Sequence, residues 1–183
     1  MKYTQAEKLQ ISMLCEIYRK LGIDNSYDPD VIDSAITSDN YWVIDWEYQS
    51  LHSGEKTPPE VTFVVDTIDM FSILEYTYNH MSKEEQTEVA DAIGHFDPTH
   101  SLIFPGFDGN NESHYMTIAH MLESIGRFSG TDITKNSHCP KEDIYRRMLE
   151  IFLPARKKFE HDVGISKQDF INILNARTHP ENR

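Results

Sequence analysis

The sequence of 183 residues predicts an all-α fold, a single-domain multihelical bundle of about eight helices over residues 1–183. Three observations lead to this prediction. Apolar residues recur at helical spacing in several long segments, helix-capping signals precede those segments, and no two segments alternate as strands joined by a hairpin turn. The short loops between the longest segments favour antiparallel packing of neighbouring helices. Residues 177–183 are expected to form a frayed tail.

The first helix is predicted from Thr4 to Leu21. Thr4 and Glu7 have the spacing of a capping box, and Gly22 supplies the left-handed residue with which many helices end. The helix is amphipathic, with a polar face opposite an apolar arc. The polar face contains Lys8, Ser12, Glu16 and Arg19, and the apolar arc contains Leu9, Met13, Leu14, Ile17, Tyr18 and Leu21. Cys15 is expected to be packed and chemically inert.

A short helix over residues 31–36 is predicted next, because it follows an Asp-Pro pair typical of a cap with proline at the first helical position. Residues 41–51 fit a helix or a strand, since short apolar runs are ambiguous by periodicity. We choose a helix because Trp42, Val43 and Trp46 recur at helical spacing and no neighbouring strand presents itself. Such aromatic clusters more often belong to a core or a subunit interface than to a cofactor site.

The central helix is predicted over residues 61–81, after a capping box with proline at the first helical position in residues 57–60. It is apolar on most sides, which is typical of a buried helix. Asp66 and Asp69 form its narrow polar strip, and we expect them to pair with a hydroxyl or a cation of a neighbour. Another capping box starts a helix over residues 82–93.

Residues 102–128 run from strand-like apolar residues through a Pro-Gly turn into an amphipathic helix. An irregular polar segment, residues 129–139, follows. Pro140 then opens a helix that Pro154 should kink or end. A last amphipathic helix follows Ser166, which has the position of a cap.

The net charge of −13 argues against nucleic acid as a partner, because proteins that bind it neutralise phosphates with a basic surface. The charge is unevenly spread: residues 1–133 hold 7 Lys and Arg against 23 Asp and Glu, whereas residues 134–183 hold 10 against 7. We expect the positive charge of residues 134–183 to lie against acidic helices of the same chain. The alternative is pairing with the acidic surface of a second subunit.

No segment approaches the roughly 18 apolar residues of a membrane span, and the first residues are charged where a signal peptide is apolar. The two cysteines, Cys15 and Cys139, lack the spacing of a zinc site or of a disulfide framework. We therefore expect a cytoplasmic protein with reduced thiols and with no cofactor, no metal and no membrane partner. Nucleophile elbows, phosphate-binding glycine loops and zinc-protease motifs are absent from the sequence.

A group of polar residues flanks the helix of the 102–128 segment and could form a ligand site. The group is Asp108, Glu112, His114, Arg127, Asn136 and His138. If the irregular segment folds back over the helix, these side chains would suit an anionic small molecule or a divalent metal. The competing interpretation, which we favour, is local. Asp108 follows a Pro-Gly turn and, like Asn110 or Asn111, could accept backbone hydrogen bonds where the helix starts.

Several motifs carry a family resemblance. They are F-P-G-F-D at 104–108, Glu112 and Tyr115, G-R-F at 126–128, N-S-H-C-P at 136–140 and Y-R-R-M-L at 145–149. Further segments are T-Q-A-E-K-L-Q-I-S at 4–12, V-V-D-T-I-D-M-F at 64–71 and I-N-I-L-N-A at 171–176, while residues 24–56 match least. In these motifs the sequence resembles the YfbU family of small bacterial proteins. The resemblance implies an all-helical cytosolic protein that tends to assemble with itself, and it supplies no catalytic site.

Two functional hypotheses follow. The first, which we favour, is a non-enzymatic helical interaction or regulatory module that forms a homo-oligomer and binds a possible protein partner. Its candidate interface residues are Trp42, Trp46, Tyr48, Arg156 and Lys157. The alternative is a metal-assisted hydrolase or small-anion-binding sensor with a site around Asp108, Glu112, Arg127 and His138. DNA binding by a helix-turn-helix near the C-terminus is disfavoured, since the acidic remainder would repel the duplex.

Overall fold

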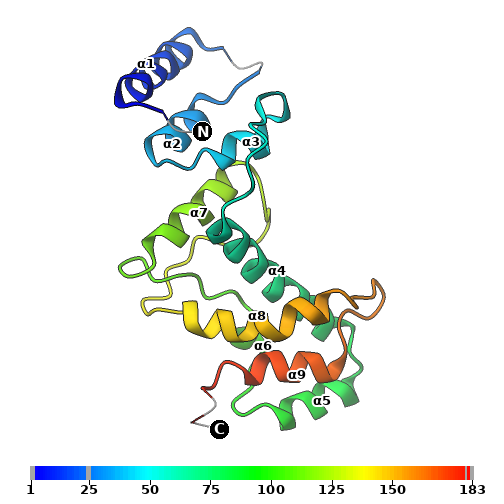
Figure 1. Cartoon of the computed structure of the whole chain (residues 1–183). Coiled ribbons are helices and arrows are strands. Elements are labelled where there is room, and N and C mark those ends of the chain that lie inside the picture. Colours follow the sequence, from blue (N-terminus) through cyan, green and yellow to red (C-terminus); the bar gives the residue numbers. More distant parts are fainter. Residues whose placement is uncertain (1–2, 24–25, 180, 182–183) are drawn as a thin grey trace. The chain divides into compact units, whose positions relative to one another are not determined.

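The computed structural model describes residues 3–23, 26–179 and 181, and in these residues it contains nine α-helices, one 3-10 turn and no sheet (Figure 1). Isolated β-bridges join Phe107 to Asn136 and Glu160 to Gly164. The all-α prediction is therefore confirmed, and the expected number of about eight helices is close. Part of the expected frayed tail, residues 180, 182 and 183, lies outside the described residues. No helix in the described ranges is long and apolar enough to cross a membrane.

The chain folds into two compact units. Unit 1 contains Met1–Thr62 and Thr117–Thr134, and unit 2 contains Phe63–Met116 and Lys135–Arg183. Two helices, α4 (Pro59–His80) and α7 (Ser113–Ser124), contribute residues to both units. The single domain over 1–183 stays a prediction, and each unit is described by itself.

Unit 1 begins with three consecutive helices, α1 (Gln5–Leu21), α2 (Pro29–Thr37) and α3 (Trp42–Glu47), followed by the 3-10 turn η1 (Gln49–Leu51). α1 packs on α2 and α2 packs on α3. The capping box of α1 is present, with Thr4 and Glu7 bonded to each other's backbone N–H, and Gly22 adopts the left-handed conformation. The predicted helix over 41–51 is confirmed for Trp42–Glu47, whereas Tyr48 ends this helix and residues 49–51 form the separate 3-10 turn η1.

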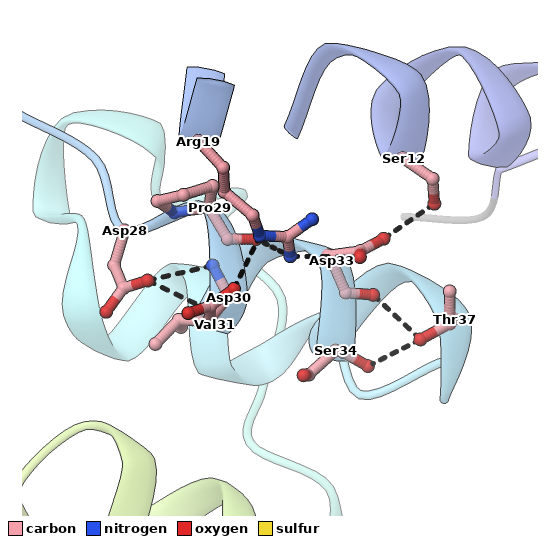
Figure 2. A network of polar contacts seen from close by, with 9 residues as sticks. All are labelled: Ser12, Arg19, Asp28, Pro29, Asp30, Val31, Asp33, Ser34 and Thr37. Atoms are coloured by element: carbon pink, nitrogen blue, oxygen red, sulfur yellow. Dashed lines mark hydrogen bonds and ion pairs between the residues drawn. The ribbon is translucent and has the colours of Figure 1, made fainter. Parts of the chain in front are cut away.

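The polar face of α1 lies against α2, as Figure 2 shows for two of its residues. Ser12 Oγ donates to Asp33 at 2.6 Å, and Arg19 bonds Asp30 through Nε at 2.6 Å and Asp33 through Nη2 at 3.1 Å. Lys8 pairs with Asp39, just beyond α2, at 2.5 Å. The buried Cys15 lies on the same side of α1. These contacts leave the apolar arc of α1 on the outside, which reverses the usual arrangement of an amphipathic helix.

Unit 2 is built around α4, whose residues Val64, Ile68, Met70, Phe71 and Leu74 are buried. The other helices of this unit are α5 (Lys83–Ala92), α6 (Pro98–Ser101), α8 (Glu142–Arg156) and α9 (Lys167–Asn175). α9 packs on both α5 and α8 (Figure 1). The prediction of a buried central helix is confirmed.

Arginine and lysine side chains of residues 134–183 pair with acidic residues of unit 2. Arg156 at the end of α8 lies 2.8 Å from Asp66 and 3.5 Å from Asp69 of α4, and Lys167 pairs with Glu88 of α5. For these residues the expected pairing within the chain is confirmed. α8 also continues two residues past Pro154, so the proline does not end this helix.

Candidate functional site

The predicted ligand residues of unit 2 gather where the segment after the Pro-Gly turn meets the segment before α8. Phe107 forms a parallel bridge with Asn136, and the Ser137 N–H donates to the Phe107 carbonyl at 3.0 Å. The two backbones approach so closely that a Cβ on Gly106 would lie 1.8 Å from the Lys135 carbonyl oxygen. Gly106 also has a φ of +89°, so only glycine fits this position.

Glu112 is a buried carboxylate that joins three backbone segments. Its Oε1 accepts hydrogen bonds from the N–H groups of Lys141 and Glu142, both at 2.7 Å, and its Oε2 accepts one from the Asp108 N–H at 2.9 Å. Glu112 therefore caps the N-terminus of α8, where a negative charge also interacts favourably with the helix dipole. The charge of this buried carboxylate is matched by backbone donors.

Asp108 is also buried and is held by local hydrogen bonds. Its Oδ2 accepts from the Asn111 side chain at 2.5 Å, and its Oδ1 accepts from the Asn110 N–H at 3.0 Å. The Asn111 side chain and the backbone N–H of Asn110 together hold the pKa of Asp108 below its ordinary value. These bonds agree with the local interpretation of Asp108 as an acceptor where the helix starts, while ligand binding by Asp108 stays a prediction.

Asn136 links the two loops from the other side. Its Oδ1 accepts from the Gly109 N–H at 3.2 Å and from the His138 N–H at 2.8 Å. His138 is exposed and has a φ of +55°. The positive charge that this histidine can carry also favours ionisation of Asp108, so a smaller part of the lowered Asp108 pKa comes from it.

The other two predicted ligand residues lie apart from these hydrogen bonds. His114 is exposed on α7 and its ring lies 3.9 Å from that of Tyr115. Arg127 belongs to unit 1, where its guanidinium lies 5.8 Å from the centroid of the Trp46 ring. In the described ranges no three His, Cys, Asp or Glu residues are grouped as metal ligands would be. Ligand binding by these residues stays a prediction.

Four of the five predicted interface residues have contacts within the chain. Trp42 is buried, and the half-buried Trp46 packs edge-on against it with ring centroids 5.2 Å apart. The Tyr48 hydroxyl accepts a hydrogen bond from the Asp28 N–H at 2.8 Å. Arg156 is held by Asp66 and Asp69. Lys157 is exposed, and contact of any of the five with a second chain stays a prediction.

The outer side of α1 is a candidate functional surface that was not predicted from the sequence. The side chains there form what we call the α1 apolar face, which is Leu9, Met13, Leu14, Ile17 and Leu21, each between 52% and 68% exposed. A signal for this orientation is present in the sequence. The polar face of the first helix contains Lys8 and Arg19, and the segment that follows, residues 28–39, carries four Asp. From this complementary charge, one could have predicted that the polar face of α1 packs against α2.

Comparison with known proteins agrees with the motifs found in the sequence. The YfbU domain profile matches residues 1–176, which run through both units. The UPF0304 protein MJECS11 of Methanocaldococcus jannaschii is 24% identical over 180 residues, and the alignment covers 94% of this chain and 99% of that protein. Because the profile matches nearly the whole sequence, the chain belongs to the YfbU family.

Proposed function

We propose that this protein is a non-enzymatic helical module that assembles with a second copy of itself through the α1 apolar face. The observation that carries the proposal is the exposure of five neighbouring apolar side chains on one helix. Single exposed apolar residues are ordinary on protein surfaces, but a contiguous apolar patch is typical of an interaction site.

The contacts of α1 with the following segment support the proposal that the α1 apolar face is an interaction surface. Turning α1 to bury its apolar face would remove Lys8, Ser12 and Arg19 from the carboxylates of Asp30, Asp33 and Asp39. Hydrogen bonds and ion pairs with α2 therefore hold the helix in the orientation that exposes the apolar residues. A second helix with the same face could cover them without disturbing these contacts.

The size of the face favours a second copy of the chain. Burial of an aliphatic side chain removes roughly 100 Å² from water, so the five together offer on the order of 500 Å². A standard dimer interface buries about 800 Å² per partner. Tyr27, which is 39% exposed, lines a groove of about 170 Å³ with Leu14 and Tyr18 and adds to the same side. In a two-fold dimer each copy presents the same patch, so the available apolar area is matched on both sides.

The arrangement of the face also suits helix pairing. Leu9, Met13, Ile17 and Leu21 follow one another at intervals of four residues, which forms a ridge along the helix. Ridges of this type pack into the grooves of an identical helix at a crossing angle near −50°.

The experiment is sedimentation velocity of the wild type and of Ile17→Glu. Burial of a carboxylate in place of an apolar side chain is expected to weaken the dimer by roughly 2 kcal/mol, about 30-fold in the dissociation constant. The matched control is Val163→Glu, because Val163 is 55% exposed in unit 2. A wild type that sediments as a 21.3 kDa monomer at micromolar concentration, or an equal effect of both substitutions, would contradict the proposal.

The alternative function, a metal-assisted hydrolase or small-anion-binding sensor, has less support. Its proposed residues Asp108, Glu112 and His138 do lie in one unit, but both carboxylates are already hydrogen-bonded to backbone or amide donors. These bonds give both carboxylates a role within the fold that requires no ligand. We therefore place the function in a surface of the protein, and a ligand retained by purified protein would favour the alternative.

A further inference from the structure

Unit 1 contains a cavity of about 320 Å³ that the proposed assembly does not use. Its walls come from α1, α2, α3 and the loop that follows, and four aromatic residues line it: Tyr3, Tyr41, Trp42 and Trp46. The rings form two edge-on pairs, Tyr3 with Tyr41 at 5.1 Å and Trp42 with Trp46 at 5.2 Å. The volume falls within the range of about 300–1,000 Å³ typical of small-molecule sites.

The tryptophan side chains are fixed by hydrogen bonds at their polar ends. The Trp42 indole N–H donates to Asn40 Oδ1 at 3.0 Å, and the Trp46 indole N–H donates to Thr57 Oγ1 at 3.2 Å. With these donors satisfied, the rings offer a ligand apolar surface and π-electron density rather than hydrogen-bond donors. Thr57 itself lines the cavity, so this hydrogen bond connects α3 to the loop that follows η1.

The charged residues of the lining favour a positive ligand. Three carboxylates, from Asp39, Asp45 and Glu55, stand against one ammonium, from Lys56. The Asp45 side chain is only 14% exposed, accepts hydrogen bonds from Ser53 N–H at 2.9 Å and Ser53 Oγ at 2.5 Å, and lies 3.6 Å from His52 Nδ1. Burial opposes ionisation of Asp45, but the hydrogen bonds from Ser53 and the interaction with His52 together leave its pKa below the ordinary value.

Two aromatic residues of the wall already lie close to cations of the chain. The ammonium of Lys8 is 5.9 Å from the centroid of the Tyr41 ring, and the guanidinium of Arg127 is 5.8 Å from that of Trp46. These distances are those of cation–π contacts. Lys8 is also paired with Asp39, whose side chain is 66% exposed. The Asp45 side chain is only 14% exposed, so water screens its attraction for a further cation less.

We propose that this cavity binds a small organic cation, an alkylammonium or arylammonium, with its apolar body against the aromatic walls and its charge toward Asp45. Aromatic walls with a nearby carboxylate stabilise an ammonium group through the ring quadrupoles and through direct attraction. An anionic ligand of the same size would meet the carboxylates. The site lies in unit 1 and is distinct from the loop junction of unit 2, where the alternative ligand site was predicted from the sequence.

The chain offers a direct signal for occupancy, because both of its tryptophans line the cavity. Tryptophan fluorescence of the full chain is recorded during titration with 2-phenylethylammonium, with 2-phenylethanol and with phenylacetate. The three probes share an aromatic body and differ in charge. We expect a saturable change with the ammonium at a concentration roughly tenfold lower than with the alcohol, and no saturable change with the carboxylate. An equal response to ammonium and alcohol, or no saturable response to any probe, would overturn the proposal.

Variants assign the signal to the cavity. Asp45→Asn retains an acceptor for the Ser53 N–H and is expected to abolish the preference for the ammonium over the alcohol. Asp91→Asn, an exposed aspartate of α5 in unit 2, is the matched control and should behave as wild type. Asp39→Asn is a second variant in case Asp45→Asn disturbs the loop, because Asp39 has a φ of +60°, which asparagine adopts readily. A preference that survives both cavity substitutions would contradict the proposed role of these carboxylates. Titration of Ile17→Glu separates this result from self-association.

Discussion

At α8 the capping position is occupied by Lys141, whose side chain has only donors and forms no cap hydrogen bond. Glu112, 29 residues earlier in the chain, supplies the acceptor to the first N–H groups of the helix. Capping by a local residue can be found in a sequence, as it is for Thr4 and Ser82, because the acceptor has a fixed spacing. Capping by a distant residue has no such spacing. The sequence therefore identified Glu112 as a candidate ligand residue but did not indicate that it caps α8.

Glu112→Ala is expected to destabilise the protein by about 2–4 kcal/mol, because three backbone N–H groups lose their acceptor. The measurement is the urea midpoint of unfolding followed by circular dichroism. Glu123→Ala is the control, since Glu123 is exposed on α7 and lies 3.9 Å from the imidazole of His120. A loss below about 0.5 kcal/mol, the usual limit for surface substitutions, would mean that Glu112 does not hold α8.

Asp108→Asn tests the second buried carboxylate through pH. Because the folded pKa of Asp108 is lowered, its ionised form stabilises the folded state above the unfolded pKa of about 3.9, and this stability is lost as pH falls through the folded pKa. We expect the variant to be less stable than wild type at pH 7 and the difference to shrink below about pH 4. The measurement is the urea midpoint at both pH values.

A different outcome for Asp108→Asn would revive the ligand hypothesis. If the variant matches wild type in stability at pH 7 but loses a metal or small anion that wild-type protein retains in native mass spectrometry, Asp108 is a ligand residue. The hydrogen bonds from Asn110 and Asn111 would then be incidental. The two measurements separate the capping role from the binding role.

At the scale of the element, helix ends follow from local chemistry, but the face that a helix buries depends on its neighbours. The bounds of α1 agree with its capping box and with Gly22. Its buried side is set by the carboxylates of Asp30 and Asp33, which belong to the next helix. Periodicity identifies two faces and does not say which one meets a partner inside the chain.

Asp33→Asn is expected to loosen α1 from α2, because Asp33 accepts from both Ser12 and Arg19 (Figure 2). The Ser12 hydrogen bond is the main favourable contribution that lowers the pKa of this half-exposed carboxylate, followed by that of Arg19, while burial opposes them. A loss of roughly 1 kcal/mol corresponds to about fivefold faster amide hydrogen exchange in α1. Exchange in α4 should be unchanged, and an equal change in both helices would show global destabilisation instead.

At the end of α8, contacts with other parts of unit 2 outweigh the helix-breaking effect of Pro154. Proline inside a helix removes one backbone hydrogen bond and crowds the preceding turn. Beyond Pro154, however, Ala155 is buried, and Arg156 is held by Asp66 and lies 5.5 Å from the Phe152 ring. The burial of Ala155 and the pairing of Arg156 with Asp66 favour a helical last turn, and the partner Asp66 lies outside residues 142–156.

At the scale of the whole molecule, the all-α class could be predicted because the long elements have helical periodicity and several of them have local caps. The division into two units could not. Two of its three boundaries, after Thr62 and after Met116, fall inside the helices α4 and α7 rather than in a linker, and only the third, after Thr134, lies in an irregular segment. The aromatic cavity was also missed, since the segment with Trp42 and Trp46 suggests packing and only its meeting with α1, α2 and the following loop makes a hollow.

The order of the units along the chain has a consequence for synthesis on the ribosome. The chain passes from unit 1 to unit 2, returns to unit 1 for Thr117–Thr134 and then completes unit 2. Neither unit is continuous, so unit 1 cannot be complete until residue 134 has emerged, and α8 cannot receive its cap from Glu112 until residue 142 has. The nascent chain therefore carries two unfinished units at once, and every contiguous fragment that contains all of one unit also contains part of the other.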